Sequence, residues 1–239
     1  LLLSGCTSNK KDDNTLIIGM DDTFAPMGFK NDEGEIVGFD VELAKEVGKI
    51  IGKTFTFQNI DWDLKETELQ NGNIDLLWNG YSITEKRKEN VLFSDPYLEN
   101  KQIIITLKDS GITCKEDLVN KTVSVQKNSS AYEAASKDTQ FISQLKNKEL
   151  VQLETNNDCF MDLEAKRSDA IIVDETLARY YMKQQNKDIY LVLEDNFGVE
   201  EYGIGMRKDE TELANQINDA LKQLKNNGKF DEIKSKWFS

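Results

Sequence analysis

Short apolar segments alternate with amphipathic segments along almost the whole chain. The apolar segments, such as TLIIGM (15–20) and DAIIVD (169–174), have the length of buried strands. Between them lie segments such as FDVELAKEVGKII (39–51), in which apolar residues recur at helical spacing before a glycine. This alternation predicts an α/β fold in which mostly parallel sheets are flanked by helices.

The alternation restarts after the strand-like segment KQIIITL (101–107), and the strands are too many for one sheet in a chain of 239 residues. We therefore expect two lobes, formed by residues 15–101 with 203–239 and by residues 102–202, after a leading segment 1–14. No Gly/Ser-rich linker separates the lobes, so the connections are expected to be extended strands that act as hinges.

Charge and composition exclude several classes of function. The formal net charge of −13 repels phosphate backbones, so no nucleic-acid partner is expected. The chain has no histidine, which excludes Ser-His-Asp and Cys-His catalysis and histidine ligation of a metal. Glycine-rich nucleotide loops and calcium-loop spacing are also absent from the sequence. We expect no cofactor, no metal and no enzymatic activity.

The three cysteines bear on the location of the protein. The first follows LLLSG (1–5), and this aliphatic, small, small, Cys pattern resembles the end of a bacterial lipoprotein signal peptide. It predicts a lipid on Cys6 that anchors an exported protein to the outside of the cell membrane, since each buried CH₂ contributes about 0.8 kcal/mol. The alternative is an unmodified apolar terminus. Cys114 and Cys159 could pair in an exported protein, although two inert thiols are favoured.

Polar residues follow four of the predicted strands, where open α/β sheets bind their ligands. They are Asp21, the segment Asn79-Gly80-Tyr81-Ser82, the segment from Gln126 to Ser130, and Asp174. Each has an ordinary structural alternative: Asp21 could stabilise a turn, Asp174 could cap the next helix, and the serines could be helix caps only.

Arg87 lies one turn into a short predicted helix that Thr84 caps. It stands in the charge run EKRKE (85–89), which alone would indicate a solvated helix face, and Lys86 and Lys88 are expected to face water. A buried arginine requires an anion, and a buried aspartate requires a cation. The backbone of a free α-amino acid carries both charges and would satisfy both groups.

Three segments resemble, in order and spacing, the hallmarks of the family 3 solute-binding proteins of bacterial ABC transporters. They are GFDVELAKEVGKII (38–51), SITEKRKENVLFSDPY (82–97) and DAIIVDE (169–175). The resemblance covers about residues 15–239 and implies a two-lobed, periplasmic-binding-protein-like fold of type II. It further implies a monomeric receptor that binds one free L-amino acid and delivers it to an ABC permease.

The resemblance also implies roles for individual residues. Arg87 would clamp the ligand α-carboxylate, Asp174 would accept hydrogen bonds from the α-ammonium group, and Ser82 would bind either group. The remaining implied contacts are backbone groups of Asn79 and Gly80, an acidic group near the ligand side chain from Asp21, aromatic walls from Phe24 and Trp62, and hydroxyl or amide donors from Ser129 and Ser130.

Two positions depart from the family pattern. Asn128 stands where glycine is usual, at a position where a left-handed backbone is expected, and it could project into the cleft. Trp78 is unusually bulky for its position and could belong to the core or to the wall of the site.

The acidic pair Asp21-Asp22 and the absence of a second candidate arginine disfavour glutamate and aspartate as ligands. A neutral polar amino acid is favoured, and a basic one stays open because aromatic side chains stack on guanidinium groups. Two other classes also stay open on the same fold. One is a carboxylate-dependent dehydratase with Glu200 or Glu201 as its acid, and the other is a ligand-sensing module.

Overall fold

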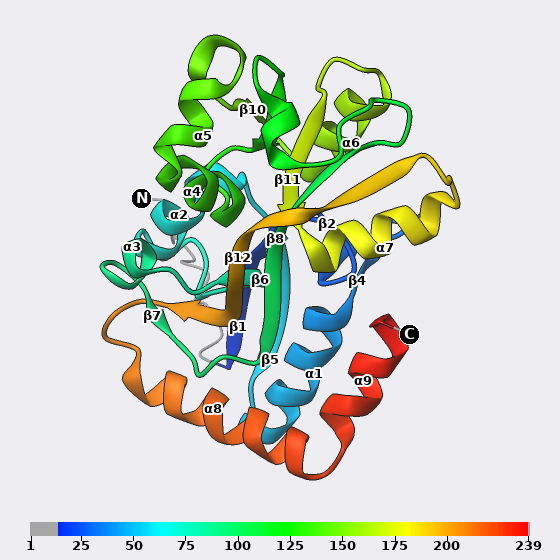
Figure 1. Ribbon diagram of the computed structural model, residues 1–239. Helices are drawn as coiled ribbons and strands as arrows, with labels where there is room; N and C mark the ends of the chain where they lie inside the picture. The colour runs from blue at the N-terminus through cyan, green and yellow to red at the C-terminus, as the bar shows by residue number, and fades with distance from the viewer. Residues whose placement is uncertain (1–13, 239) are drawn as a thin grey trace, which may run out of the picture.

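The computed structural model describes residues 14–238 and shows an α/β molecule with two lobes (Figure 1). Within those residues a nine-stranded sheet runs in the order β10-β9-β11-β8-β12-β6-β1-β5, with β7 added beside β12. Its strands are β1 Thr15–Met20, β5 Thr54–Asn59, β6 Leu76–Ser82, β7 Leu92–Phe93, β8 Leu98–Leu107, β9 Val123–Gln126, β10 Val151–Leu153, β11 Ala170–Asp174 and β12 Tyr190–Met206. A small antiparallel sheet contains β2 Thr23–Phe24, β3 Gly28–Lys30 and β4 Ile36–Val37.

Helices flank both halves of the large sheet (Figure 1). They are α1 Phe39–Ile51, α2 Lys65–Gln70, α3 Glu85–Lys88, α4 Ser130–Lys137, α5 Thr139–Gln144, α6 Asn156–Glu164, α7 Glu175–Gln185, α8 Thr211–Asn226 and α9 Lys229–Phe238. Short 3₁₀ turns lie at Trp62–Leu64, Lys115–Leu118 and Lys146–Lys148. Most of these elements match the alternation predicted from the sequence.

Strands β8 and β12, hereafter the hinge strands, connect the two lobes (Figure 1). They pair antiparallel with each other, β12 also pairs with β6 of one lobe, and β8 pairs with β11 of the other. Away from the hinge strands the pairing is parallel, as in β5-β1-β6 and β10-β9-β11. The two-lobed, mostly parallel fold is therefore confirmed. The expectation that the strands are too many for one sheet is wrong, because β8 and β12 join the strands of both lobes into a single sheet. The exact lobe boundaries stay a prediction.

The sequence pattern also predicts separate strands at IYLVLE (189–194) and YGIGM (202–206), only turns after β1, and a capping box on Thr113 and Glu116. The structure differs from all three predictions. The segments IYLVLE and YGIGM are not separate strands but parts of β12, whose register shifts absorb the polar residues between them. The turn-rich stretch after β1 contains the small sheet β2-β3-β4. The capping box expected from Thr113 and Glu116 lies one residue later, on Cys114 and Asp117. In the first two cases, strand pairing selected among local options that the sequence pattern could not distinguish.

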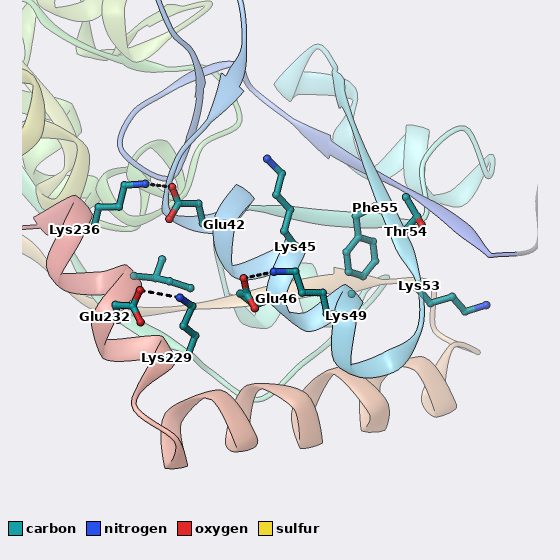
Figure 2. Close-up of a pocket in the computed structure, with 12 residues that line it drawn as sticks. Glu42, Lys45, Glu46, Lys49, Lys53, Thr54, Phe55, Lys229, Glu232 and Lys236 are labelled. Atoms are coloured by element: carbon teal, nitrogen blue, oxygen red, sulfur yellow. Dashed lines mark hydrogen bonds and ion pairs between the residues drawn. The ribbon is translucent and has the colours of Figure 1, made fainter.

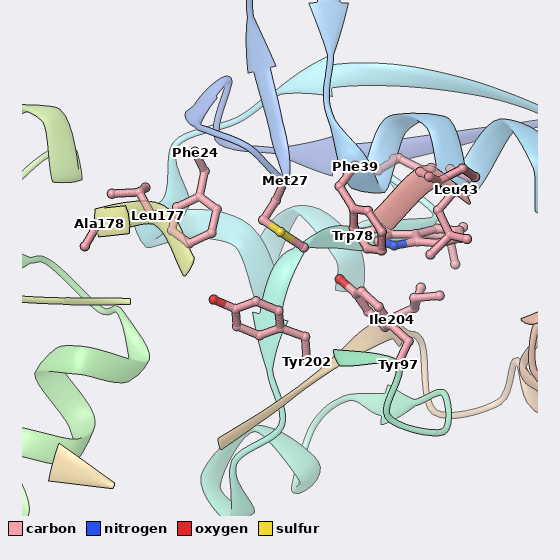
Figure 3. Packing of buried hydrophobic residues seen from close by; sticks show 14 of the residues in the cluster. Phe24, Met27, Phe39, Leu43, Trp78, Tyr97, Leu177, Ala178, Tyr202 and Ile204 are labelled. Carbon is pink, nitrogen blue, oxygen red and sulfur yellow. The ribbon is translucent and has the colours of Figure 1, made fainter. Parts of the chain in front are cut away.

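Trp78 lies in the hydrophobic core of the lobe that contains α1. This side chain is 1% exposed and packs edge-on against Phe55 and beside Tyr97, with ring centroids 6.2 and 6.4 Å apart. Figure 3 shows it next to Phe39 and Leu43 of α1. Burying a large apolar side chain contributes roughly 1.5–3 kcal/mol. Trp78 is therefore a core residue of β6, and its burial stabilises the strand on the side away from the site.

Two of the three cysteines lie in the described residues. Cys6 lies outside them. Cys114 is partly exposed, Cys159 is buried, and both are free thiols. Between residues 14 and 238 no helix is long and apolar enough to span a bilayer.

Candidate functional site

A small cavity lies between the two lobes and is lined from both sides. One side comes from loops and strands around β6, and the other from the loop before α4, the start of α6 and the end of β11. The lining residues are Phe24, Trp62, Gly80, Ser82, Arg87, Gln126, Ser129, Ser130, Ala131, Asn156 and Asp174. All of the residues predicted for the site except Asp21 and Asn79 line this cavity.

Arg87 is directed into the cavity rather than toward solvent. Thr84 caps the first turn of α3 by accepting a hydrogen bond from the Arg87 amide at 3.2 Å. The Arg87 side chain is 5% exposed, while Lys86 and Lys88 on either side are exposed as predicted. Its Nη1 donates to the Ser82 carbonyl at 2.8 Å, and the guanidinium lies 4.4 Å from the centroid of the Tyr81 ring.

No carboxylate within residues 14–238 forms an ion pair with Arg87. Its guanidinium has five N–H donors, and the hydrogen bond to Ser82 uses only part of that capacity. A buried guanidinium with spare donors is suited to a bidentate carboxylate.

Asp174 presents the opposite charge to the same cavity. Its carboxyl is 7% exposed and accepts hydrogen bonds from Asn100 Nδ2 at 2.9 Å and from Gln102 Nε2. It stands before α7 but makes no side-chain cap, so the capping alternative is wrong. Burial, followed by the nearby charge of Glu200, raises the pKa of Asp174 well above its usual value.

Two serine hydroxyls meet where the lobes approach each other. Ser82 Oγ of β6 lies 2.9 Å from Ser130 Oγ of α4. Ser129, in contrast, accepts a hydrogen bond from the Tyr132 amide at 3.1 Å and donates to the Gln126 carbonyl at 2.7 Å. The Ser129 hydroxyl therefore caps α4, and Ser130 is the better placed of the two for a ligand.

Asp21 and Asn79 lie behind the cavity wall. Asp21 Oδ2 accepts a hydrogen bond from Gln126 Nε2 at 2.9 Å, and its other oxygen stabilises the turn at Thr23. Burial raises the pKa of Asp21. The Asn79 side chain accepts from the Asp21 amide at 3.1 Å and donates to the Gly28 carbonyl at 3.3 Å. Asp21 can thus act on the site through Gln126, while the Asn79 side chain holds the Asp21 loop.

Gly80 has a backbone φ of +56°, which favours glycine, and an added Cβ would lie 2.8 Å from the Phe24 ring. Its amide donates to Asp40 Oδ2 at 2.7 Å. The Gly80 N–H is therefore directed into the protein, and the sequence-based expectation that it serves a ligand is wrong for this group.

The two positions that depart from the family pattern do not enter the cavity. Trp78 is in the core. Asn128 has the left-handed backbone that was predicted, with φ +49°, but its side chain crosses to Asp63 of the other lobe. Lys65 also contacts the loop of Asn128 from the other lobe. Its buried ammonium donates hydrogen bonds to the carbonyls of Trp62 and Asn128, each at 3.0 Å. Burial, followed by the charge of Arg87, lowers the pKa of Lys65 to about 7.

Sequence reasoning gave no individual role to several polar residues of the site, including Gln126, although it placed the segment from Gln126 to Ser130 after a strand. Gln126 and Asn156 line the cavity and hydrogen-bond to each other at 2.9 Å. Asn100 and Gln102 lie two residues apart in the polar first half of β8, before its apolar run, so both lie on the same face of that strand. Charged Glu99 and Lys101 alternate with them, so no local pattern distinguished this pair. From the sequence, Glu200 was considered only as the acid of a dehydratase and not as a ligand-binding group.

The hollow between α1 and α9 lies on the outer surface, away from this cavity (Figure 2). Its charged side chains form ion pairs with one another, including Lys49–Glu46 at 2.7 Å and Lys229–Glu232 at 2.8 Å. Within residues 14–238 no group of three or more His, Cys, Asp or Glu side chains could hold a metal ion. The interlobe cavity is therefore the site that combines buried charges of both signs.

Comparisons with known proteins agree with this geometry. The model of the bacterial extracellular solute-binding proteins, family 3, matches residues 16–239. The chain is 35% identical over 246 residues to the arginine-binding extracellular protein ArtP of Bacillus subtilis, an alignment that covers 99% of this chain and 89% of that protein. It is 33% identical over 233 residues to the glutamine-binding protein GlnH of the same species, covering 95% and 82%.

The fold is also similar to that of a solved structure. The substrate-binding protein of an ABC uptake transporter from Streptococcus pneumoniae, with bound histidine, superimposes with a TM-score of 0.92 at 41% identity, covering 94% of this chain and 92% of that one. The family match includes both lobes, the hinge strands and all the residues that line the cavity. This chain therefore belongs to family 3 of the bacterial extracellular solute-binding proteins.

Proposed function

We propose that this protein is an extracytoplasmic receptor that binds one free L-amino acid between its lobes and delivers it to an ABC permease. The observation that carries the proposal is the pair Arg87 and Asp174. Both are buried, both line the same cavity, and neither forms an ion pair within residues 14–238. An α-amino acid supplies the carboxylate for one and the ammonium for the other.

The ligand orientation follows from the positions of these groups. The α-carboxylate binds the Arg87 guanidinium beside the hydroxyls of Ser82 and Ser130. The α-ammonium binds Asp174. The side chain then extends between Phe24 and Trp62 toward Gln126. No bond is made or broken, and affinity comes from pairing two opposite charges in a site that excludes water.

We further propose that a cationic side chain is preferred to the neutral polar one that the sequence favoured. Asp21 is a buried carboxylate behind Gln126, and Arg87 is the one lysine or arginine among the residues that line the cavity. Trp62 and Phe24 provide aromatic faces suited to a guanidinium or imidazolium group. Relatives described as arginine-binding or holding histidine support this class, while the glutamine-binding relative supports the neutral one.

The lipid anchor on Cys6, a monomeric state and the absence of catalysis are parts of the same proposal. The relatives named above are binding proteins, which supports a receptor rather than an enzyme. Replacing Cys6 with serine should release the protein from bacterial membranes into the soluble fraction. Membrane retention of the Cys6→Ser protein would contradict the anchor and leave the amino-acid site untouched.

A thermal-shift screen of the twenty amino acids tests the receptor. A ligand that binds only the folded state stabilises it by RT ln(1 + [L]/Kd), about 2.7 kcal/mol at 100 times Kd. We expect a rise in melting temperature with arginine, lysine or histidine, and unchanged amino acid when the sample is analysed afterwards. No shift with any amino acid, or consumption of one, would refute the receptor function. A shift with glutamine alone would refute the cationic preference.

A further inference from the structure

Glu200 on hinge strand β12 reaches the edge of the ligand cavity. Its Oε1 accepts hydrogen bonds from Ser82 Oγ at 2.7 Å and from Ser130 Oγ at 3.3 Å. Both serines line the cavity, and they come from different lobes. Glu200 thus contacts, from the hinge, the two hydroxyls that meet where the lobes close.

The other hinge strand, β8, holds Glu200 and Asp174 together. Asn100 Nδ2 lies 2.9 Å from Asp174 Oδ1 and 2.8 Å from Glu200 Oε1. Gln102 Nε2 donates to Glu200 at 2.7 Å and also contacts Asp174. Because the two carboxyl groups share the same two amides, they lie close enough to repel each other when both are ionised.

This cluster has neutral donors that are shared between its acceptors, and it has no cation within the described residues. Gln102 Nε2 carries two hydrogens but lies within hydrogen-bonding distance of three acceptors, the third being Ser130 Oγ at 3.2 Å. In the part of the chain that the structure describes, no lysine or arginine forms an ion pair with Asp174 or Glu200. An ammonium group would bring one positive charge and three N–H donors to this point.

We propose that Glu200 is a second carboxylate of the ligand site, which binds the α-ammonium group of the amino acid together with Asp174. This inference rests on the proposed receptor function and adds a residue that no hallmark segment contains. Because Glu200 belongs to a hinge strand, its contact joins the ligand to the element that connects the lobes. Ligand binding would then favour the closed arrangement directly through the hinge.

A purely structural Glu200 makes a different prediction. If Glu200 only braced the hinge, its replacement by glutamine would lower the stability of the unliganded protein. In the ligand-binding account, Glu200→Gln removes one of two repelling carboxylates and adds an N–H donor that can face Asp174. The unliganded variant should therefore melt at the same temperature as the wild type or higher, while binding more weakly.

The experiment compares Glu200→Gln with Glu201→Gln, a matched control whose exposed side chain lies next along the same strand. Isothermal titration calorimetry measures Kd for L-arginine, L-histidine and L-glutamine. For each ligand that the wild type binds, an analogue without the α-amino group is titrated as well, such as 5-guanidinopentanoic acid for arginine. Thermal unfolding without ligand is recorded for all three proteins.

We expect Glu200→Gln to bind the amino acid about 30-fold more weakly than the wild type. Glu201→Gln should be unchanged, and the loss should disappear with the analogue that lacks the amino group. Equal Kd values for the two variants, or an equal loss with the analogue, would overturn the role of Glu200 at the α-ammonium. If the wild type binds none of the twenty amino acids of the thermal-shift screen, the receptor function fails first and this inference fails with it.

Discussion

At the scale of single residues, the site depends on a few backbone and side-chain positions that admit little change. Gly80 shows this clearly. Its left-handed backbone turns β6 past Phe24, and its amide is fixed by Asp40 beneath the cavity. The residue therefore shapes the wall of the site without offering a side chain to the ligand.

Replacing Gly80 with alanine is expected to weaken both folding and binding. The new methyl would lie 2.8 Å from Phe24 and the backbone would be strained at φ +56°. Strain of this kind costs on the order of 1–3 kcal/mol. Denaturant unfolding and calorimetric titration would measure the two effects, with Gly34→Ala as control, because its φ of +83° brings the same strain but no atom lies within 4 Å of its added Cβ. Equal losses in the two variants would contradict the role of the Phe24 contact.

Residue by residue, the sequence identified groups that carry charge better than groups that only position them. Asp174 and Ser82 were predicted from their places after strands, and Arg87 from its place one turn into a capped helix and from the family resemblance; all three line the cavity. Asn79 was predicted for the same reason, yet its side chain binds the Asp21 loop. Position after a strand brings a residue to the site, but the direction of its side chain depends on contacts with chain segments far away in sequence.

At the scale of elements, the strands and helices of the sequence pattern are largely those of the structure. The sequence pattern did not predict those strands that are extended only because they pair with another strand. The polar middle of β12 has no strand signal of its own, and it is extended because it pairs with β8 over the hinge. The brief strands β2 and β3 exist because they pair with each other. Such elements cannot be recognised from local periodicity alone.

The hinge strands also explain why the site contains residues that sequence reasoning missed. Asn100 and Gln102 lie in β8, which the sequence indicates only as a connection between the lobes, and the sequence indicates Glu200 on β12 only as the acid of a dehydratase. Their side chains nevertheless meet beside Asp174 because β8 pairs with both β11 and β12. The elements that permit movement between lobes are thus also the ones that deliver polar groups to the cavity.

At the scale of the whole molecule, the lobes contact each other around the cavity through polar groups. Thr84 Oγ1 donates to Glu133 at 3.0 Å, Gln126 to Asp21 at 2.9 Å, and Lys65 to the Asn128 carbonyl at 3.0 Å. Two of the charged groups in these contacts, Asp21 and Lys65, are buried, whereas Glu133 is only partly buried. The stability of the closed molecule should therefore depend on pH.

Buried carboxylates set the direction of that dependence. Burial raises the pKa of Asp40 from 3.8 to about 7 and also raises the pKa values of Asp21 and Asp174. A raised carboxyl pKa means that the folded state binds protons more tightly than the unfolded state. The resulting stabilisation is complete below the unfolded pKa and is lost as the pH rises through the folded pKa.

We therefore expect the unliganded protein to be more stable at pH 5 than at pH 7. Asp40 alone should account for about 2 kcal/mol of that difference. The lowered pKa of Lys65, about 7, affects stability mainly above this interval. Denaturant unfolding at the two pH values measures the change. Asp40→Asn should flatten the pH dependence, whereas a steeper fall in stability toward pH 5 would contradict the assignment.

The central claim is that a buried Arg87 binds the α-carboxylate of a free amino acid. Calorimetric titration of Arg87→Ala against Lys86→Ala tests it most directly, because the two side chains are adjacent in α3 and only Arg87 faces the cavity. Both variants should first be shown to unfold cooperatively. We predict that Arg87→Ala loses about 2–5 kcal/mol of binding free energy, and that Lys86→Ala binds like the wild type. Binding by Arg87→Ala at near wild-type affinity would contradict the account.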